Sequence, residues 1–396
     1  MKTSIGLVLS KPPNYSETFL VNKIKGLQAN GIDIELFAAQ NRDGFSLCTT
    51  HIMPKVYRNL VLFAFQYVIV ILSLLPYFKT VWRFVRLEKA SGTSNFKLLK
   101  LIFLNSHMLK ANLDWLHFGF ASQTIGSEFV AKAIGAKMAV SFRGFDINEF
   151  PKKHKDCYLK LWKNVDKVHS ISQYLVDEAY KLGLDKSIPV VIISPAVDMS
   201  FINAIKDKTK PKPKEGMLIC TVARLNWIKD FTTAIKTISL LKLKYPQISY
   251  SIIGGGSLKE KEQYLHLVEE LGLQDQVVFY DKLSHAETIL KMNECDIYLQ
   301  TSINEGFCNA VLEAQALGRL CVATNVGGLK ENIVDTKTGW LVEPQNPIAI
   351  SEKIIEIVNL SKLELDNIKA EAVKRVETKF NTEIQMKSFV EFYKNS

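Results

Sequence analysis

Two glutamates, Glu305 and Glu313, lie eight residues apart between a predicted strand and a predicted helix. The apolar run 296–300 before them is typical of a buried strand. The good helix formers of 310–317, followed by Gly318, are typical of a helix that ends at a glycine. In a parallel α/β sheet such a junction lies at the carboxyl edge, where ligands bind. Free N–H groups at the helix start suit a phosphate, and carboxylates can accept hydrogen bonds from sugar hydroxyls.

The run from Glu305 to Gly318 resembles the paired-glutamate motif of retaining family-4 glycosyltransferases of the GT-B fold, in particular the colanic acid and capsular polysaccharide branch. The alternative is that two glutamates at this spacing occur by chance in a helical protein. The resemblance implies that Glu305 holds the transferred sugar and that Glu313 binds the ribose of a nucleotide-sugar donor. It also implies donor contacts from the four residues after Glu305, which are Gly306, Phe307, Cys308 and Asn309.

Arg224 and Lys229 follow an apolar run that is predicted to be the first strand of the second half of the chain. An arginine fork and a lysine ammonium at the end of a strand can converge on a diphosphate. Taken alone, the pair is also typical of a solvated loop. The stretch resembles the family element Arg-Leu-x-x-x-Lys-Gly/Asp, which implies that both cations hold the nucleotide diphosphate and that no metal is needed.

Two glycine turns follow predicted strands in the same half. Gly254 and Gly255 predict either a plain turn or a loop that contacts the base of the donor, because glycines let a backbone approach a ligand closely. For Val326 to Gly328 we favour a turn that ends a strand.

The first half of the chain contains weaker candidates. Ser16 is a plausible helix cap, and the run Ser16-Glu17-Thr-Phe resembles a family loop that faces the cleft, which implies acceptor-side contacts. That loop lacks the Gly-Gly pair of many relatives, so a phosphate contact is not expected from it.

His117 lies at a strand end where the family has a sugar-contacting histidine, although lone histidines are more often structural. The run from Ser141 to Asp146 resembles the family's Ser-Phe-His-Gly-x-Asp, with Arg143 in place of the histidine. Because arginine stays protonated, its expected role is electrostatic rather than that of a base. The resemblance thus implies catalytic roles for His117 and Arg143, and an acceptor-side role for Asp146.

Strands are predicted at 4–10, 32–38, 115–118, 137–142, 167–171 and 190–194 in the first half, and at 217–223, 249–253, 277–280, 296–300, 320–323 and 339–342 in the second. Their alternation with helical segments predicts an α/β protein with two doubly wound, Rossmann-like parallel-sheet domains. The GT-B resemblance implies that they face a central cleft. The 396 residues suffice for two domains, and a segment with two prolines and almost no apolar residues predicts a linker. We expect an acceptor-side domain at 1–205, a linker at 206–216, a donor domain at 217–378, and a C-terminal helix at 379–396 that packs back on the first domain.

The basic excess of the chain lies in its first half. Of the net charge of +10, residues 1–205 carry 25 basic and 15 acidic side chains, whereas the rest carries 25 of each. No nucleic-acid motif accompanies this charge, so no nucleic-acid partner is expected. The apolar run 60–76, with basic flanks at 55–58 and 79–86, predicts either a buried helix or an interfacial helix pair on an anionic membrane. It is close to the lower length limit for a membrane span.

The six cysteines show no zinc-ligand spacing and no disulfide pattern, and the first ten residues read as a strand rather than a signal peptide. We therefore expect a cytoplasmic protein, peripheral on the inner membrane, without metal or other cofactor. The expected activity is retaining transfer of a hexose from a UDP- or GDP-sugar to a lipid-linked or polysaccharide-precursor acceptor. The alternatives are a sugar-nucleotide epimerase of the same fold and a non-catalytic nucleotide-binding membrane scaffold.

Overall fold

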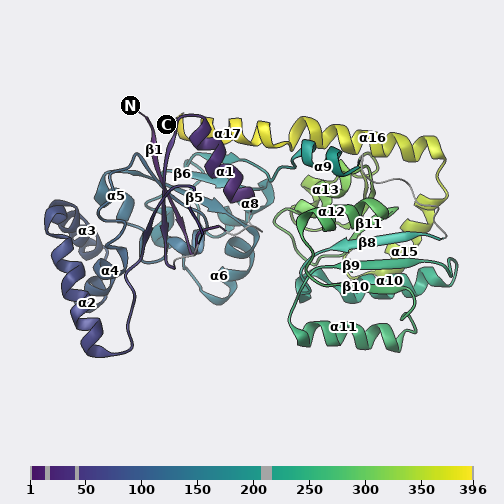
Figure 1. The fold of residues 1–396 in the computed structure, drawn as a ribbon, viewed down its shortest axis with the longest axis horizontal. Coiled ribbons are helices and arrows are strands. Elements are labelled where there is room, and N and C mark those ends of the chain that lie inside the picture. The colour runs from purple at the N-terminus through teal and green to yellow at the C-terminus, as the bar shows by residue number, and fades with distance from the viewer. Residues whose placement is uncertain (1, 14–17, 41–43, 207–215, 395–396) are drawn as a thin grey trace. The chain divides into compact units, whose positions relative to one another are not determined.

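The computed structural model describes residues 2–13, 18–40, 44–206 and 216–394 (Figure 1). The chain divides into two units, the first made of Met1–Ile193 and Met386–Ser396 and the second of Ser194–Gln385. The first unit therefore ends twelve residues before the expected boundary at 205. The predicted linker falls mostly on 207–215, which lie outside the described residues.

The first unit is built on a parallel sheet of seven described strands in the order β3-β2-β1-β4-β5-β6-β7. Apolar runs predicted six of these strands. The exception is β3, whose four residues are all exposed or half-buried and therefore carry no strand pattern. The strands are β1 Ser4–Leu9, β2 Asp33–Ala38, β3 Thr49–Ile52, β4 Trp115–Phe118, β5 Lys137–Phe142, β6 Lys167–Ser170 and β7 Val190–Ile192.

Described helices lie in each connection of this sheet except the one from β2 to β3, as is usual between parallel strands. Those of the first unit are α1 Thr18–Ala29, α2 Leu60–Ser73, α3 Phe78–Ala90, α4 Asn95–Asn105, α5 Val130–Ile134, α6 Phe150–Lys153, α7 Leu159–Trp162 and α8 Gln173–Lys181. A π-helical turn, Phe145–Glu149, precedes α6.

The last helix, α17 Thr382–Lys394, contributes Phe389, Val390, Phe392 and Tyr393 to the core of the first unit. The Lys167 ammonium donates to the Phe392 carbonyl oxygen at 2.7 Å, which satisfies a carbonyl near the end of the helix. The end of the chain is thus part of the first unit's core.

The second unit has a parallel sheet of six described strands in the order β10-β9-β8-β11-β12-β13. All six agree with the predicted apolar runs to within about one residue at each end. They are β8 Leu218–Val222, β9 Ser249–Ile253, β10 Val277–Tyr280, β11 Ile297–Gln300, β12 Leu320–Thr324 and β13 Trp340–Val342.

Helices cover both faces of this sheet, so it is doubly wound (Figure 1). Buried side chains of α10, α11 and α15 fill the core on one face, and α12, α13 and α16 lie on the other. The helices are α9 Met199–Lys206, α10 Phe231–Lys242, α11 Leu258–Glu270, α12 His285–Glu294, α13 Asn309–Ala316, α14 Leu329–Asn332, α15 Pro347–Val358 and α16 Lys362–Lys379.

Helix α9 was expected in the first domain, but it belongs to the second unit. It packs against α12 and α13, where the ring of Phe201 stacks on His285 with 4.9 Å between ring centroids. The apolar face of α9 therefore packs within the second unit, so the boundary between the units lies before α9 rather than at 205.

Helix α2 is exposed, so the alternative of a buried core helix is wrong. Val70 is its only side chain that is buried, whereas Leu60, Val61 and Phe65 are 81%, 77% and 67% exposed. No single described helix is long and apolar enough to cross a membrane. The pair Leu60–Ser73 and Leu75–Ala90, bent by 49°, meets the length and composition of a span only when taken together.

Candidate functional site

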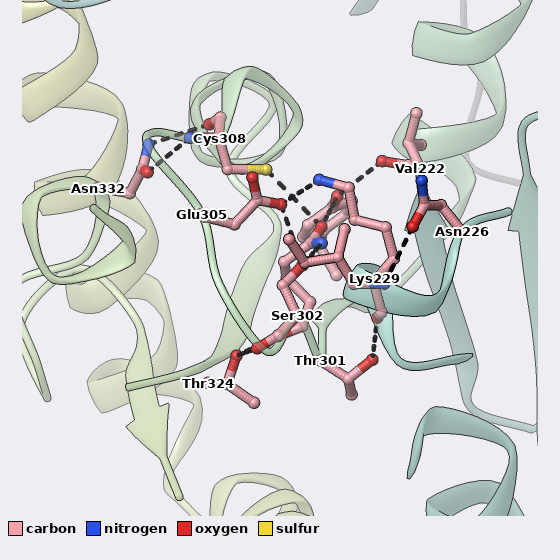
Figure 2. Close-up of polar contacts among 12 residues, drawn as sticks. Val222, Asn226, Lys229, Thr301, Ser302, Glu305, Cys308, Thr324 and Asn332 are labelled. Carbon is pink, nitrogen blue, oxygen red and sulfur yellow. Dashed lines mark hydrogen bonds and ion pairs between the residues drawn. The ribbon is translucent and has the colours of Figure 1, made fainter. Parts of the chain in front are cut away.

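Lys229 and Glu305 form an ion pair at the carboxyl edge of the second sheet (Figure 2). Lys229 ends a 3₁₀ turn, Trp227–Lys229, shortly after β8, and Glu305 lies in the loop between β11 and α13. Their side chains are 18% and 11% exposed, so both groups are largely desolvated yet reachable from solvent. The structure thus brings together one predicted cation and one predicted carboxylate.

Hydrogen bonds between the two loops fix this pair. The Thr301 hydroxyl donates to the carbonyls of Lys229 and Asp230 at 3.1 and 2.9 Å, and the Ile303 amide donates to the Ile228 carbonyl at 2.8 Å. Buried hydrogen bonds between backbone and side chain rigidify a loop because breaking them leaves polar groups unsatisfied. The loop geometry is therefore set before any ligand binds.

A chain of buried hydrogen bonds runs from β11 to Glu305 (Figure 2). Tyr298 donates to Gln300 Oε1 at 2.7 Å, Gln300 Nε2 to Ser302 Oγ at 2.7 Å, and Ser302 Oγ to Glu305 Oε1 at 3.0 Å. Sequence reasoning did not single out these three residues. Their signal is the spacing of two, which places Tyr298 and Gln300 on one face of β11, with Ser302 two residues beyond the end of the strand.

The glycine turn at 254–256 supports the loop that carries Arg224. A Cβ atom at Gly254, whose φ is +145°, would lie 2.0 Å from the Ala223 carbonyl oxygen, and one at Gly256 would lie 2.4 Å from Leu225 Cβ. Gly255 has only Lys282 Cβ nearby, at 3.8 Å. The turn therefore allows two loops to touch, and base contacts by Gly254 and Gly255 stay a prediction. Arg224 itself is exposed.

The turn at 326–328 does more than end a strand. The Gly328 amide donates to the Glu305 carbonyl at 2.8 Å, and a Cβ atom on Gly328 would lie 2.0 Å from the Gly306 carbonyl oxygen. The contact holds the Glu305 loop close to the start of α14, and only glycine permits it.

The start of α13 is held by Asn332 rather than by a side-chain cap of its own. Asn332 accepts from the Cys308 amide at 2.9 Å and donates to the Cys308 carbonyl at 3.0 Å. Burial raises the pKa of the Cys308 thiol to about 12, with nearby Glu305 as the next cause, so the thiol is neutral. Phe307 is buried beside the ring of Phe380, and Asn309 is exposed.

Glu313 lies in the body of α13, one turn beyond its start, and pairs with His285. His285 Nε2 and Glu313 Oε1 are 2.8 Å apart, and the two side chains are 45% and 19% exposed. The hydrogen bond to Glu313 is the main reason that the pKa of His285 is raised above its usual value. The sequence alone offered little reason to select His285 as a site residue, because it is simply the first residue of a helix capped by Ser284.

The predicted catalytic residue His117 is enclosed in the core of the first unit, and its catalytic role stays a prediction. The side chain has no exposed surface, and its Nε2 and Nδ1 atoms hydrogen-bond with Ser141 Oγ at 2.8 Å and Tyr393 OH at 2.5 Å. Burial and then nearby Lys23 hold its pKa well below the usual range, so the ring is neutral. A fully enclosed ring with both nitrogens bonded is part of the core and touches no substrate in this conformation.

Asp146 is also enclosed, and its acceptor-side role stays a prediction. Its Oδ1 accepts from the Ser122 amide at 3.2 Å and from the Ser122 hydroxyl at 2.6 Å. Burial raises the carboxyl pKa to about 6, against the opposing effect of these hydrogen bonds. Asp146 therefore fixes the turn at 121–124 within the first unit.

Arg143 is half-buried, with its guanidinium 4.2 Å from the ring centroid of Phe19 and 5.4 Å from that of Phe120. Such stacking fits a fixed positive charge better than a proton-transfer group. The remaining predicted acceptor-side residues, Ser16 and Glu17, lie outside the described residues. Within the described ranges, no group of three or more His, Cys, Asp or Glu side chains could hold a metal ion.

One known family matches most of the second unit. Residues 203–375 match the profile of the family described as Glycosyl transferases group 1, which covers less than half of the chain and includes the Lys229–Glu305 site.

Two relatives match along nearly the whole length. The chain is 24% identical to the amylovoran biosynthesis glycosyltransferase AmsK of Erwinia amylovora, over 96% of each chain. It is also 24% identical to a candidate colanic acid biosynthesis glycosyltransferase, WcaL, of Escherichia coli, over 96% of this chain and 97% of that one.

Solved structures share the fold. A glycosyltransferase of Rickettsia africae superimposes with a TM-score of 0.72 at 19% identity, over 100% of this chain and 98% of the other. The Anabaena protein HepE, solved with UDP, gives a TM-score of 0.73 at 14% identity over both whole chains. With its two parallel α/β sheets, the chain therefore has the GT-B fold.

Proposed function

We propose that this chain, which carries a Glycosyl transferases group 1 domain, is a retaining glycosyltransferase of cell-surface polysaccharide synthesis. It transfers a hexose from a UDP- or GDP-sugar to a lipid-linked or polysaccharide-precursor acceptor. Relatives named for amylovoran and colanic acid biosynthesis support the polysaccharide product, and HepE, solved with UDP, supports a nucleotide-sugar donor.

The Lys229–Glu305 pair carries this proposal. An ammonium group has three N–H donors, so Lys229 can bond a phosphate oxygen while it keeps its bond to Glu305. The exposed Arg224 supplies a second, planar cation from the same strand end, and the N-terminus of α13 adds partial positive charge. Three positive groups at one edge of the sheet suit a donor with a diphosphate next to a sugar.

The chemical step that these residues serve is a same-face displacement. The bond between the anomeric carbon and the diphosphate oxygen breaks, and a bond to the acceptor oxygen forms on the same face. The acceptor hydroxyl gives its proton to a phosphate oxygen of the leaving nucleotide. Arg224 and Lys229 stabilise the charge that develops on the leaving group, so the reaction needs no metal.

The two glutamates bind the organic parts of the donor. Glu305, held by Ser302 and the buried chain from Tyr298, accepts hydrogen bonds from the transferred hexose and stabilises positive charge at the anomeric carbon. Glu313 accepts hydrogen bonds from the ribose, and its partner His285 orients the carboxylate.

We further propose that the protein works at the cytoplasmic face of the inner membrane as a peripheral protein. Helices α2 and α3 expose Leu60, Phe65, Phe78 and Trp82, and exposed basic residues flank them. An apolar surface rimmed by Lys and Arg is the pattern of interfacial helices on anionic lipid. A lipid-linked acceptor would be reached from such a position.

A donor screen tests this function. Purified protein is titrated with UDP-, GDP- and ADP-sugars while its thermal unfolding is followed, since a ligand at 100 times its dissociation constant stabilises a protein by about 2.7 kcal/mol. The stabilising donor is then incubated with the protein alone and with lipid extract. We expect a glycosylated lipid only with extract. An epimer formed from donor alone would instead assign an epimerase.

A further inference from the structure

An apolar cavity of about 540 Å³ lies between α2 and α4 in the first unit, outside the candidate site. Aromatic side chains of α2 and α4 meet at the wall of this cavity. Tyr67 of α2 stacks on Phe103 of α4 with 5.5 Å between centroids, and Phe63 meets the same ring edge-on at 5.4 Å. We call this cavity the α2–α4 pocket. Its lining also includes Val56, Ala64, Val68, Phe96, Leu99, Lys100 and Leu104.

The pocket has the size and chemistry of a ligand site rather than of a packing defect. Binding cavities typically measure about 300–1,000 Å³ and are mostly apolar with few polar groups. Residues on its wall that face outward are unusually exposed, with Phe96 at 84% and Leu99 at 52%. An apolar concavity that opens through exposed apolar side chains is unfavourable in water, and a ligand of matching chemistry would cover it.

The charge around the pocket selects an anionic ligand. Lys100 is exposed on its wall, and Lys97 is exposed one turn earlier on α4. The segment 51–110 contains nine basic residues and one acidic residue, Glu88, which is fully buried and hydrogen-bonded to Thr93. No carboxylate of this segment therefore reaches the surface to repel an anion.

One polar atom beside the pocket lacks a partner. The Tyr67 hydroxyl is shielded from solvent and has no hydrogen-bond partner among the described residues, and burial raises its pKa. Buried hydroxyls nearly always find a partner, so an unsatisfied one marks a place where the surroundings are incomplete.

We propose that the α2–α4 pocket binds one acyl chain of an anionic phospholipid, with the lipid phosphate beside Lys100. The proposal rests on the membrane attachment proposed above and goes beyond it. A protein can attach to a membrane through an exposed apolar face without any pocket. Binding one lipid whose acyl chain leaves the bilayer requires a pocket that fits the chain. The exposed face of α2 would enter the interface, and the chain would pass between α2 and α4.

The test is calorimetric titration of the full-length protein with lysophosphatidylglycerols of increasing chain length, each below its critical micelle concentration. We expect saturable binding of one lipid per protein. Each added methylene should tighten binding roughly fourfold until the pocket is full. Lysophosphatidylcholine of the same chain length should bind about fivefold more weakly, and Lys100→Gln should remove that preference.

Two matched variants separate the pocket from general attraction to lipid. Ala64→Trp adds a large side chain at an exposed wall position and should weaken lysolipid binding at least about tenfold, because the indole occupies the space of several methylenes. Leu62→Trp places the same side chain on α2 outside the pocket and should bind like wild type. Circular dichroism spectra and thermal unfolding confirm that both variants are folded.

Three results would overturn the assignment: wild-type affinity in Ala64→Trp, no saturation, or tighter binding of a short polyprenyl phosphate than of lysophosphatidylglycerol. Flotation with anionic vesicles is measured in parallel. Lysolipid binding without flotation would refute membrane attachment but keep the pocket, whereas flotation with equal lysolipid affinity in both Trp variants would refute the pocket alone.

Discussion

Lys229 and Glu305 each neutralise the other in a partly desolvated place, so removing either leaves a charge without its partner. We therefore expect Lys229→Ala to affect both donor affinity and folding. Arg224 is exposed, and we expect its loss to leave the fold intact. This asymmetry follows from burial alone and could not be inferred from two cations in one loop.

For Arg224→Ala we expect donor affinity to fall about tenfold or more with little change in Tm. A charge-assisted hydrogen bond contributes roughly 1.5–3 kcal/mol to binding. Calorimetric titration with the donor identified by the thermal screen measures the loss. Lys261→Ala, which removes a cation that pairs with Asp281 in the same unit, is the control. Equal donor affinity in Arg224→Ala and wild type would remove the phosphate assignment.

For Lys229→Ala we expect a similar loss of donor affinity together with lower stability, because the half-buried Glu305 is left without its ammonium partner. The double variant Lys229→Ala, Glu305→Gln should recover part of the stability and none of the transfer activity. Urea unfolding of the three variants measures the first effect. A double variant no more stable than Lys229→Ala would show that the pair has no structural role.

The absence of a metal requirement is a separate residue-level prediction. If Arg224, Lys229 and the N–H groups of α13 compensate the diphosphate, transfer activity should survive EDTA at the same rate. The assay uses the donor found above with lipid extract as acceptor. Loss of activity in EDTA that magnesium or manganese restores would show that the donor is bound through a metal.

His285 gives a pH dependence. Its pKa in the folded protein is raised above the usual value of 6.5, chiefly by the hydrogen bond to Glu313. The protonated His285 therefore stabilises the folded protein fully below pH 6.5. This stabilisation is lost as the pH rises through the raised pKa of His285 in the folded protein. We expect His285→Gln to have a lower free energy of unfolding than wild type in acid, and the difference should shrink toward alkaline pH. Urea unfolding at several pH values measures this difference. A gap that does not vary with pH would show that His285 does not titrate with Glu313.

At the scale of elements, close approach of neighbouring loops positions the site. The turns at 254–256 and 326–328 touch the loops that carry Arg224 and Glu305, and in both places a side chain would strike a backbone carbonyl. The glycines therefore allow the two turns to pack directly against the loops that carry Arg224 and Glu305.

Gly254→Ala should lower both Tm and donor affinity, because the new Cβ atom would lie 2.0 Å from the Ala223 carbonyl oxygen and the residue has a φ of +145°. A strained backbone of this kind costs roughly 1–3 kcal/mol. Gly255→Ala is the matched control for stability, since the atom nearest to its Cβ would be Lys282 Cβ at 3.8 Å, and we expect its free energy of unfolding to change by no more than about 0.5 kcal/mol. Thermal unfolding and donor titration measure both variants. Equal Tm values for the Gly254→Ala and Gly255→Ala variants would argue against a role for the turn in placing Arg224.

At the scale of the whole molecule, the two units divide the chemistry of the surface. The second unit carries the Lys229–Glu305 site, whereas the first carries the basic excess and the exposed helices α2 and α3. This division suits a protein whose donor is soluble and whose acceptor is held in a membrane.

Replacing Arg58, Lys79, Arg83 and Arg86 together with Gln should release the protein from anionic vesicles and leave donor binding unchanged. All four are exposed, and each basic residue near an anionic surface contributes about 1 kcal/mol. High salt should release wild type only in part, because apolar burial persists when charges are screened. Flotation assays measure attachment. Wild type that floats equally well with neutral and anionic vesicles would contradict this electrostatic attachment.

The sequence by itself determined the strands and the principal site of the second unit. Apolar runs marked twelve of the thirteen described strands, because a buried parallel strand must be apolar along its length. Polar residues after two predicted strands placed Lys229 and Glu305 at the same edge of the sheet, because parallel strands all end at one edge. That β8 and β11 are neighbours in the sheet was decided by the fold.

Only the tertiary structure decided the environment of His117, of α2 and of the glycine turns. His117 is enclosed by Tyr393, 276 residues further along the chain, and no local pattern reports a partner at that distance. Helix α2 is apolar around its circumference, so periodicity could not say whether protein, lipid or water covers it. The roles of Gly254 and Gly328 depend on carbonyls of neighbouring loops. Each case rests on a contact between distant segments, which exists only once the chain has folded.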